Sequence, residues 1–253
     1  MKIDLSGKVA VVTGSSGELG RVMALTLAEC GADVALQYHT KAAPAEAVKA
    51  RIIALGRKAC AVQADITDRT SIEAMRDVIR KELGNPDIVV TSANNGAAAK
   101  PVLEQAPEDY LLSFRSAAIQ NVLMAQVFVP SMIEKKWGRI IAISTEVVIL
   151  AHAGQSAYTA GKRGMDGVLR VLAKEIGEHQ ITVNQVAPGW TISERDRLAG
   201  SEKQDHYDKN VPLRHRGEDR DIANAVAFLA SDLARFITGV FLPVCGGNVM
   251  SSI

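Results

Sequence analysis

Cysteine is scarce in this chain of 253 residues, which contains three. Cys30, Cys60 and Cys245 are widely spaced, form no Cys-x-x-Cys motif and are odd in number. This pattern does not indicate a disulfide framework, and we predict no metal site. Reduced, mostly buried thiols fit a reducing compartment, so we expect a cytoplasmic protein.

An excess of charge is also lacking, because 29 Lys and Arg residues balance 28 Asp and Glu residues to a net charge of +1. Without a basic stripe or polybasic tail, we expect no nucleic acid and no membrane as a partner. No uninterrupted apolar run is long enough to span a bilayer, and we expect no signal segment. Aromatic residues make up 4%, which gives no sign of a pocket that stacks steroids or polycyclic rings.

The chain does contain a regular alternation of short β-branched runs and longer helical patterns. Val9-Ala10-Val11-Val12 is apolar on both faces, as a strand covered by helices on each side must be. This pattern predicts an α/β fold, a single doubly wound, Rossmann-type domain over residues 1–253 with ligands at the carboxyl ends of its parallel strands. The expected strands are 9–13, 33–36, 59–63, 88–91, 139–144 and 181–186, and the expected helices lie near 18–30, 44–55, 69–83, 107–136 and 155–178.

Tyr158 and Lys162 stand four residues apart in Tyr-Thr-Ala-Gly-Lys, inside a predicted helix. Positions i and i+4 share a helix face, so the phenol and the ammonium can reach the same bound molecule. A nearby cation favours phenolate and lowers the pKa of a tyrosine from about 10, which would make it an acid and base at neutral pH. Two exposed helix residues are the alternative interpretation of the spacing.

Residues 13–20, Thr-Gly-Ser-Ser-Gly-Glu-Leu-Gly, connect the first predicted strand to the first predicted helix. Glycines in such a turn let backbone N–H groups approach a pyrophosphate at the positive end of the helix. We predict a dinucleotide site here, with a plain strand-to-helix turn as the alternative. Asp65 follows the third strand and can accept a hydrogen bond from an adenine amino group, whereas capping of the next helix suits Asp68 or Thr67 better.

The second predicted strand ends in Gln-Tyr-His-Thr-Lys at 37–41, where no carboxylate is present. Dinucleotide folds that prefer NAD usually carry an acidic residue at this point for the ribose hydroxyls. His39, Thr40 and Lys41 can instead bind a 2′-phosphate. We therefore predict NADP(H) as the preferred cofactor and NAD(H) as the alternative; a solvated loop is the other interpretation of these residues.

In this order and spacing, the motifs resemble the short-chain dehydrogenase/reductase family, and most of all its bacterial 3-oxoacyl-thioester and sugar or polyol reductases. The resemblance runs from Gly7-Lys8 to Gly246-Gly247, nearly the whole chain. It implies a sheet of about seven parallel strands and a homotetramer or homodimer. The stretches that carry it are 13–20, 64–68, 138–141, 158–162, 183–189 and 237–239.

Carried over from the family, Tyr158 is the general acid/base, and Lys162 lowers its pKa and holds the nicotinamide ribose. The family's serine falls on Thr145, whose hydroxyl can still polarise a carbonyl oxygen. Pro188, Gly189 and Thr191 flank the nicotinamide. The full set of implied cofactor residues is Gly14, Ser16, Gly17, Leu19, Gly20, Tyr38, His39, Thr40, Asp65, Ile66, Ala93, Tyr158, Lys162, Pro188, Gly189 and Thr191.

Three positions depart from the family pattern. Glu18 stands where related chains of this length place a glycine, and a carboxylate 4 Å from a phosphate is repelled by about 1 kcal/mol in water and about 4 kcal/mol in a partly screened site. We expect Glu18 to face solvent and binding to survive. Thr-Ser-Ala-Asn at 91–94, before Asn95-Gly96, replaces Asn-Asn-Ala-Gly, a change compatible with cofactor binding.

The third departure is Ala117, which occupies the position of the family's catalytic asparagine. In the family this residue holds a water on the proton path from the lysine to solvent, and alanine cannot do so. Ser113 or Asn121, one helical turn to either side, can hold a relocated water. The alternatives are slow proton exchange or a shifted alignment of this helix.

We expect an oxidoreductase that interconverts a ketone and a secondary alcohol by hydride transfer, with a small-molecule carbonyl or alcohol as its substrate. The alternatives are a catalytically impaired nucleotide-binding homologue with a regulatory or structural role, and an NAD-linked alcohol dehydrogenase. The polar segment 193–210 is a candidate substrate lid, or else a solvated surface helix. Candidate substrate-facing residues are Glu146, Val147, His152, Gly154 and Trp190.

Overall fold

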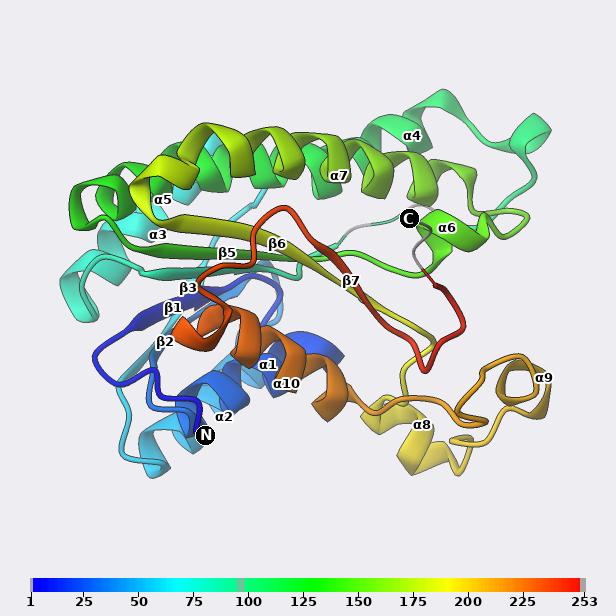
Figure 1. Cartoon of the computed structure of the whole chain (residues 1–253), viewed down its shortest axis with the longest axis horizontal. Coiled ribbons are helices and arrows are strands. Elements are labelled where there is room, and N and C mark those ends of the chain that lie inside the picture. The colour runs from blue at the N-terminus through cyan, green and yellow to red at the C-terminus, as the bar shows by residue number, and fades with distance from the viewer. Residues whose placement is uncertain (1, 95, 97, 251–253) are drawn as a thin grey trace.

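The computed structural model describes residues 2–94, 96 and 98–250, so Asn95 lies outside the described residues. Its centre is a parallel sheet of seven strands in the order β3-β2-β1-β4-β5-β6-β7 (Figure 1). The α/β prediction and the count of seven strands are confirmed. The strands are β1 Val9–Val12, β2 Asp33–Tyr38, β3 Ala59–Gln63, β4 Ile88–Thr91, β5 Gly138–Ile143, β6 Ile181–Pro188 and β7 Phe241–Val244.

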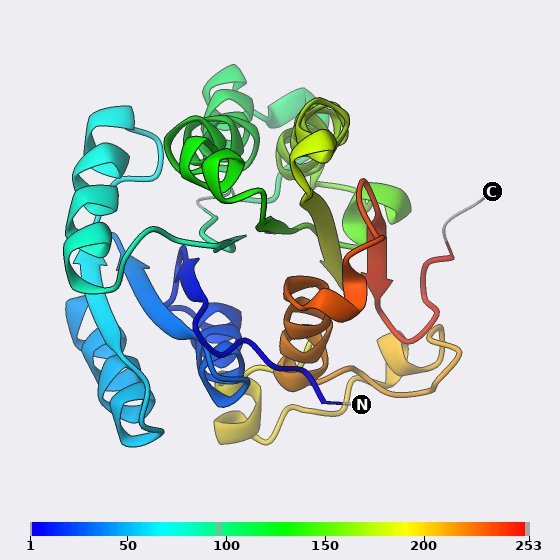
Figure 2. The same ribbon diagram turned by 60° about the vertical axis from the view of Figure 1, so that its left-hand side comes forward.

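Helices cover both faces of the sheet (Figures 1 and 2). Alternate residues of each strand point to opposite faces, so Val12 and Leu36 pack in one buried cluster while Val11 and Ala35 pack in the other. The first face is covered by α1 Glu18–Glu29, α2 Ala42–Ala54 and α10 Asp219–Ala230. The second face is covered by α3 Arg69–Glu82, α5 Gln120–Lys135 and α7 Ser156–Ile176, and α4 Pro107–Phe114 packs on α7. The short helices α6 Val147–Leu150, α8 Glu194–Ala199 and α9 Asp205–Asp208 gather at one end of the sheet (Figure 1).

The strand order reverses after β3, because β1 pairs with β2 on one side and with β4 on the other. Helical connections that leave β1 and β4 therefore diverge to opposite faces, which opens a crevice at the carboxyl ends of these strands. Thr13, directly after β1, bridges this crevice at its base. Its Oγ1 accepts hydrogen bonds from the backbone N–H groups of Ser92 and Ala93, both 3.0 Å, and donates to Gln120 Oε1 at 2.8 Å.

The single helix expected over 107–136 is interrupted. Between α4 and α5 lies a π-helical turn, Arg115–Ile119, in which the N–H of Gln120 donates to the carbonyl of Arg115. This turn inserts an extra residue and changes which side chains face the crevice. By length and composition, the combined stretch Pro107–Lys135 is the one helix of the described residues that is apolar enough to cross a membrane, but core helices pass the same test and 56% of its most apolar window is buried.

Two glycines of α7 permit its close contact with α4. An added Cβ on Gly161 would lie 2.5 Å from the carbonyl oxygen of Ser113, and one on Gly164 would lie 2.5 Å from a ring carbon of Phe114. Because Gly161 lies between Tyr158 and Lys162, this packing also fixes the height at which both side chains enter the crevice.

We predict that Gly161→Ala lowers the free energy of unfolding by about 1–3 kcal/mol, because the methyl group has to displace the backbone of α4. Gly167→Ala in the same helix is the matched control, since an added Cβ there meets nothing within 4 Å. The control should be neutral or up to about 1 kcal/mol more stable, as alanine favours helix. Denaturant unfolding of both variants measures the difference, and equal stabilities would contradict the packing described.

Candidate active site

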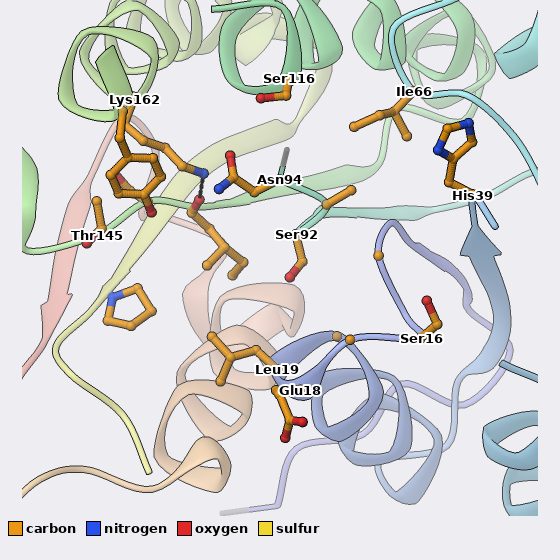
Figure 3. Close-up of a pocket in the computed structure, with 18 of the residues that line it drawn as sticks. Ser16, Glu18, Leu19, His39, Ile66, Ser92, Asn94, Ser116, Thr145 and Lys162 are labelled. Carbon is orange, nitrogen blue, oxygen red and sulfur yellow. Dashed lines mark hydrogen bonds between the residues drawn. The ribbon is translucent and has the colours of Figure 1, made fainter. Parts of the chain in front are cut away.

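A cavity of about 800 Å³ runs along the carboxyl ends of the strands, between the glycine turn and the start of α7 (Figure 3). It collects residues that lie more than 170 positions apart in the sequence, as the strand order requires. The predicted residues that line it are Gly14, Ser16, Gly17, Leu19, Gly20, His39, Thr40, Asp65, Ile66, Ala93, Thr145, Tyr158, Lys162, Pro188, Gly189 and Thr191.

Tyr38 is the one predicted cofactor residue that is not among those lining the cavity, whereas its neighbour Gln37 is. Successive strand residues point to opposite sides, and at the end of β2 it is Gln37 whose side chain faces the glycine turn. Gln37 Oε1 accepts from the N–H of Gly14 at 2.8 Å, and Nε2 donates to the carbonyl of Ala64 at 2.7 Å. This buried amide therefore ties the ends of β1, β2 and β3 together, a role that the sequence motifs did not reveal.

The glycine turn has the shape that a phosphate group needs. Gly14 adopts φ +66° and lies so close to the loop after β4 that an added Cβ would meet Cα of Ala93 at 2.8 Å. A Cβ on Gly20 would lie 2.2 Å from the carbonyl oxygen of Gly14, so the first turn of α1 can pack directly on the turn only with glycine there. The amino end of α1 consequently opens into the cavity, where its N–H groups favour an anion.

The far end of the cavity carries His39, Thr40 and Lys41 on one side and Asp65 on the other. The backbone N–H and the hydroxyl of Thr67 both donate to Asp65 Oδ1, at 2.8 and 2.7 Å. These hydrogen bonds lower the pKa of Asp65, so it stays an acceptor. The N-cap of α3 is Asp68, whose carboxylate accepts from the N–H groups of Thr70 and Ser71, as the preference for Asp68 over Asp65 indicated.

Tyr158, Lys162 and Thr145 lie at the other end of the cavity, the first two from α7 and the third just after β5. Figure 3 labels Lys162 and Thr145. Lys162 is fully enclosed, its Nζ donates to the carbonyl of Ile143 at 2.7 Å, and burial lowers its pKa to about 8. Burial also raises the pKa of Tyr158, and a hydrogen bond with the Thr145 side chain offsets only part of this increase. The expected lowering of the tyrosine pKa by the lysine is therefore not seen, because Lys162 Nζ lies 6.0 Å from the ring centroid and desolvation dominates at both residues.

The chain is similar to known proteins along nearly its whole length. The family model described as enoyl-(acyl carrier protein) reductase matches residues 14–248. The 3-oxoacyl-[acyl-carrier-protein] reductases of Pseudomonas aeruginosa and Haemophilus influenzae are 34% and 36% identical to this chain, and each alignment covers 98% of it and all of the relative. The chain belongs to the short-chain dehydrogenase/reductase family. Two solved structures are similar to the chain, and each match covers 98% of both chains. A Sinorhizobium meliloti protein described provisionally as a short-chain alcohol dehydrogenase has a TM-score of 0.88 at 29% identity. An Agrobacterium tumefaciens protein described provisionally as a gluconate dehydrogenase has a TM-score of 0.90 at 25% identity.

Of the positions that depart from the short-chain dehydrogenase/reductase pattern, Glu18 is accommodated by its neighbours. It is the first residue of α1, and its side chain points away from the glycine turn (Figure 3). Oε2 accepts from Arg21 Nη2 at 2.8 Å and from the backbone N–H of Glu194 at 3.0 Å. The side chain is 47% exposed, as expected, and it fastens the start of α8 to the glycine turn.

The residues offered as substitutes for the missing asparagine do not line the cavity. The side chain of Asn121 makes structural hydrogen bonds within the fold. Its Oδ1 accepts from Thr91 Oγ1 and its Nδ2 donates to the carbonyl of Ala117, both at 2.8 Å. Ser113 is buried against α7. Because of the π-helical turn, Ser116 lines the cavity instead, with Asn94 between it and Lys162 (Figure 3). A sequence alignment could not place Ser116, since the turn leaves no sequence motif.

Arg216 holds the segment after β6, and sequence analysis missed it. Its buried guanidinium donates to the carbonyls of Trp190, Thr191, Ser201 and Glu202 and to Asp196 Oδ2, at 2.9–3.3 Å. This one side chain fixes the segment that contributes Gly189 and Thr191 to the cavity. No short motif surrounds Arg216, so only its long-range contacts reveal it.

We predict that Lys162→Met raises the stability of the protein at pH 7. The folded-state pKa of about 8 lies below the ordinary value of 10.5, so holding the ammonium in this site costs roughly 3 kcal/mol below pH 8 and nothing above pH 10.5. Loss of the hydrogen bond to Ile143 reduces the resulting gain in stability by about 1–2 kcal/mol. The Tm should rise by about 2–5 °C at pH 7 and by less at pH 9.5.

Lys174→Met is the control, because Lys174 lies exposed on the same helix. Thermal unfolding of both variants between pH 6.5 and 9.5 measures the effect. A Lys162→Met protein that is less stable than the parent at pH 7 would contradict the electrostatic assignment.

Proposed function

We propose that this protein is an NADP(H)-dependent oxidoreductase that interconverts a ketone and a secondary alcohol, with Tyr158 as the general acid/base. The observation that carries the proposal is the meeting of Tyr158, Lys162 and Thr145 at the same end of one cavity as Pro188 and Gly189. The relatives named above support the reaction class, since reduction of a 3-oxoacyl group converts a ketone to a secondary alcohol.

The lining fits a dinucleotide: the glycine turn and the amino end of α1 would hold the pyrophosphate, and Asp65 and Ile66 would border the adenine. When bound, the nicotinamide would supply or accept the hydride. Thr145 Oγ1 donates a hydrogen bond to the carbonyl oxygen, and Tyr158 passes its phenolic proton to that oxygen as negative charge develops on it. Burial keeps Tyr158 protonated at neutral pH, which favours its role as the acid in the reducing direction.

Tyr158→Phe should lower kcat for ketone reduction by about 10²–10⁴-fold, since the proton donor is lost, while NADPH affinity changes only a few-fold. Tyr110→Phe is the matched control, because it removes a phenol that bonds Ser156 outside the cavity. Steady-state kinetics with an activated ketone, together with calorimetric titration of NADPH, measure both effects. Activity that survives Tyr158→Phe would overturn the proposed mechanism.

Cofactor preference tests the site formed by His39, Thr40 and Lys41. We expect NADPH to bind more tightly than NADH in separate calorimetric titrations, and Lys41→Ala to weaken NADPH about tenfold without affecting NADH, because only the 2′-phosphate meets that ammonium. A preference for NADH would instead support an NAD-linked alcohol dehydrogenase.

A catalytically impaired, nucleotide-binding homologue is the second candidate, favoured by Ala117 in place of the family's asparagine. Binding of NADPH without Tyr158-dependent turnover of any ketone would support it. We further propose a cytoplasmic homotetramer or homodimer with segment 193–210 as the substrate lid. Exposed apolar residues on the outer surfaces of α4 and α7, Leu111, Phe114 and Val171, support a subunit contact there.

A further inference from the structure

A second cavity, of about 660 Å³, adjoins the catalytic residues on the side away from the glycine turn. It shares Thr145, Gly189 and Trp190 with the cofactor cavity, and the helices α6 and α9 close it. Its volume lies in the range of small-ligand sites. Four of the five predicted substrate-facing residues line it, namely Glu146, Val147, His152 and Trp190, whereas Gly154 lines a smaller neighbouring cavity with Tyr158.

Glu146 is the unusual residue of this second cavity. It follows Thr145 directly, its backbone N–H donates to the carbonyl of Pro188 at 2.9 Å, and only 3% of it is exposed. Tyr207 donates its hydroxyl to Glu146 Oε1, and Asn248 donates an amide N–H to Oε2, both at 2.9 Å. Both partners are neutral, so they satisfy the carboxylate as an acceptor without balancing its charge. Each oxygen keeps a further acceptor site.

The remaining walls are polar but contribute no ammonium or guanidinium group among the described residues. Among the described residues that line the second cavity there is neither lysine nor arginine. Hydrogen-bonding side chains come from His152, Gln155, His206 and Asn210, while Val147 and Leu150 add apolar contacts. An anionic substrate would therefore find a buried negative charge and no guanidinium or ammonium to pair with.

We propose that Glu146 selects the substrate: its carboxylate accepts a hydrogen bond from a hydroxyl group of a small, neutral, hydroxylated ketone and rejects ketones that carry a negative charge. This inference rests on the proposed function of the same site. A carboxylate substrate in contact with Glu146 at an effective dielectric constant near 20 is disfavoured by about a hundredfold to a thousandfold in binding. A hydroxyl group beside the ketone gains a charge-assisted hydrogen bond at the same point.

Three small ketones separate the effect of a substrate charge from the effect of a substrate hydroxyl group. Erythrulose is neutral and hydroxylated. Methyl acetoacetate is a neutral ester without a hydroxyl group, and acetoacetate is the corresponding carboxylate anion. We expect kcat/KM with NADPH to fall in that order, with acetoacetate at least about a hundredfold below methyl acetoacetate. An acetoacetate rate equal to or above that of its ester would overturn the proposal, as would a preference for the ester over erythrulose.

Glu146→Gln removes the charge and keeps an acceptor for Tyr207. It should raise the ratio of acetoacetate to methyl acetoacetate at least about tenfold and lower the advantage of erythrulose, because the hydrogen bond to the substrate hydroxyl is no longer charge-assisted. Glu178→Gln is the control for net charge, since Glu178 lies before β6, at the opposite end of that strand from the site. It should leave both ratios unchanged.

Measurements on the parent protein also distinguish failure of the proposed oxidoreductase function from failure of the proposed role of Glu146. If no ketone is reduced in a Tyr158-dependent manner, the proposed function falls and this inference falls with it. If methyl acetoacetate is reduced but neither the charge nor the hydroxyl group alters kcat/KM, the oxidoreductase stands and the role of Glu146 is wrong. The ranking in the parent decides this even where Glu146→Gln fails to fold.

Discussion

The contacts that hold the carboxyl ends of the central strands together are the constraint on which the site depends. Thr13 joins the end of β1 to the loop after β4, and Gln37 joins the ends of β1, β2 and β3. Both side chains are buried, so these hydrogen bonds are shielded from water and costly to break. They hold the glycine turn against Ala93. The segments after β1 and β4, which border the crevice at the reversal of strand order, are therefore fixed relative to each other.

Three buried charged residues lie around this site. Lys162, Arg216 and Glu146 are each nearly inaccessible. Glu146 follows β5, Lys162 lies in α7 of the same β5–β6 connection, and Arg216 lies after β6. The charge of Arg216 is balanced by Asp196, whereas Lys162 and Glu146 form hydrogen bonds with the neutral groups of Ile143, Tyr207 and Asn248. Unbalanced buried charges destabilise a fold, so they persist where function requires them. A cationic Lys162 and an anionic Glu146 on two sides of Thr145 fit a site that moves a proton at one wall and selects substrates at another.

Local patterns predicted much of this structure. Six strands were placed from apolar runs, and the glycine turn, Tyr158 and Lys162 were placed from motifs, because these features depend on neighbours in the sequence. Thr145 was implied by the family resemblance. The strand β7 was implied only by the family resemblance, since Phe-Leu-Pro-Val is short and contains a proline. The π-helical turn, Gln37 and Arg216 could not be predicted, because each is defined by contacts with residues far away in the chain. Glu146 was named as a candidate from its position after β5, but its burial and neutral partners required the structure.

The most direct test of the account follows the hydride itself. NADPH deuterated at the transferable position of the nicotinamide is mixed with the protein and a prochiral ketone, and the alcohol is analysed by mass spectrometry and NMR. We expect one deuterium on the carbinol carbon of a single enantiomer, formed by the parent protein and not by Tyr158→Phe. Absence of deuterated alcohol from the parent, with NADPH bound, would contradict the claim that this cavity reduces ketones.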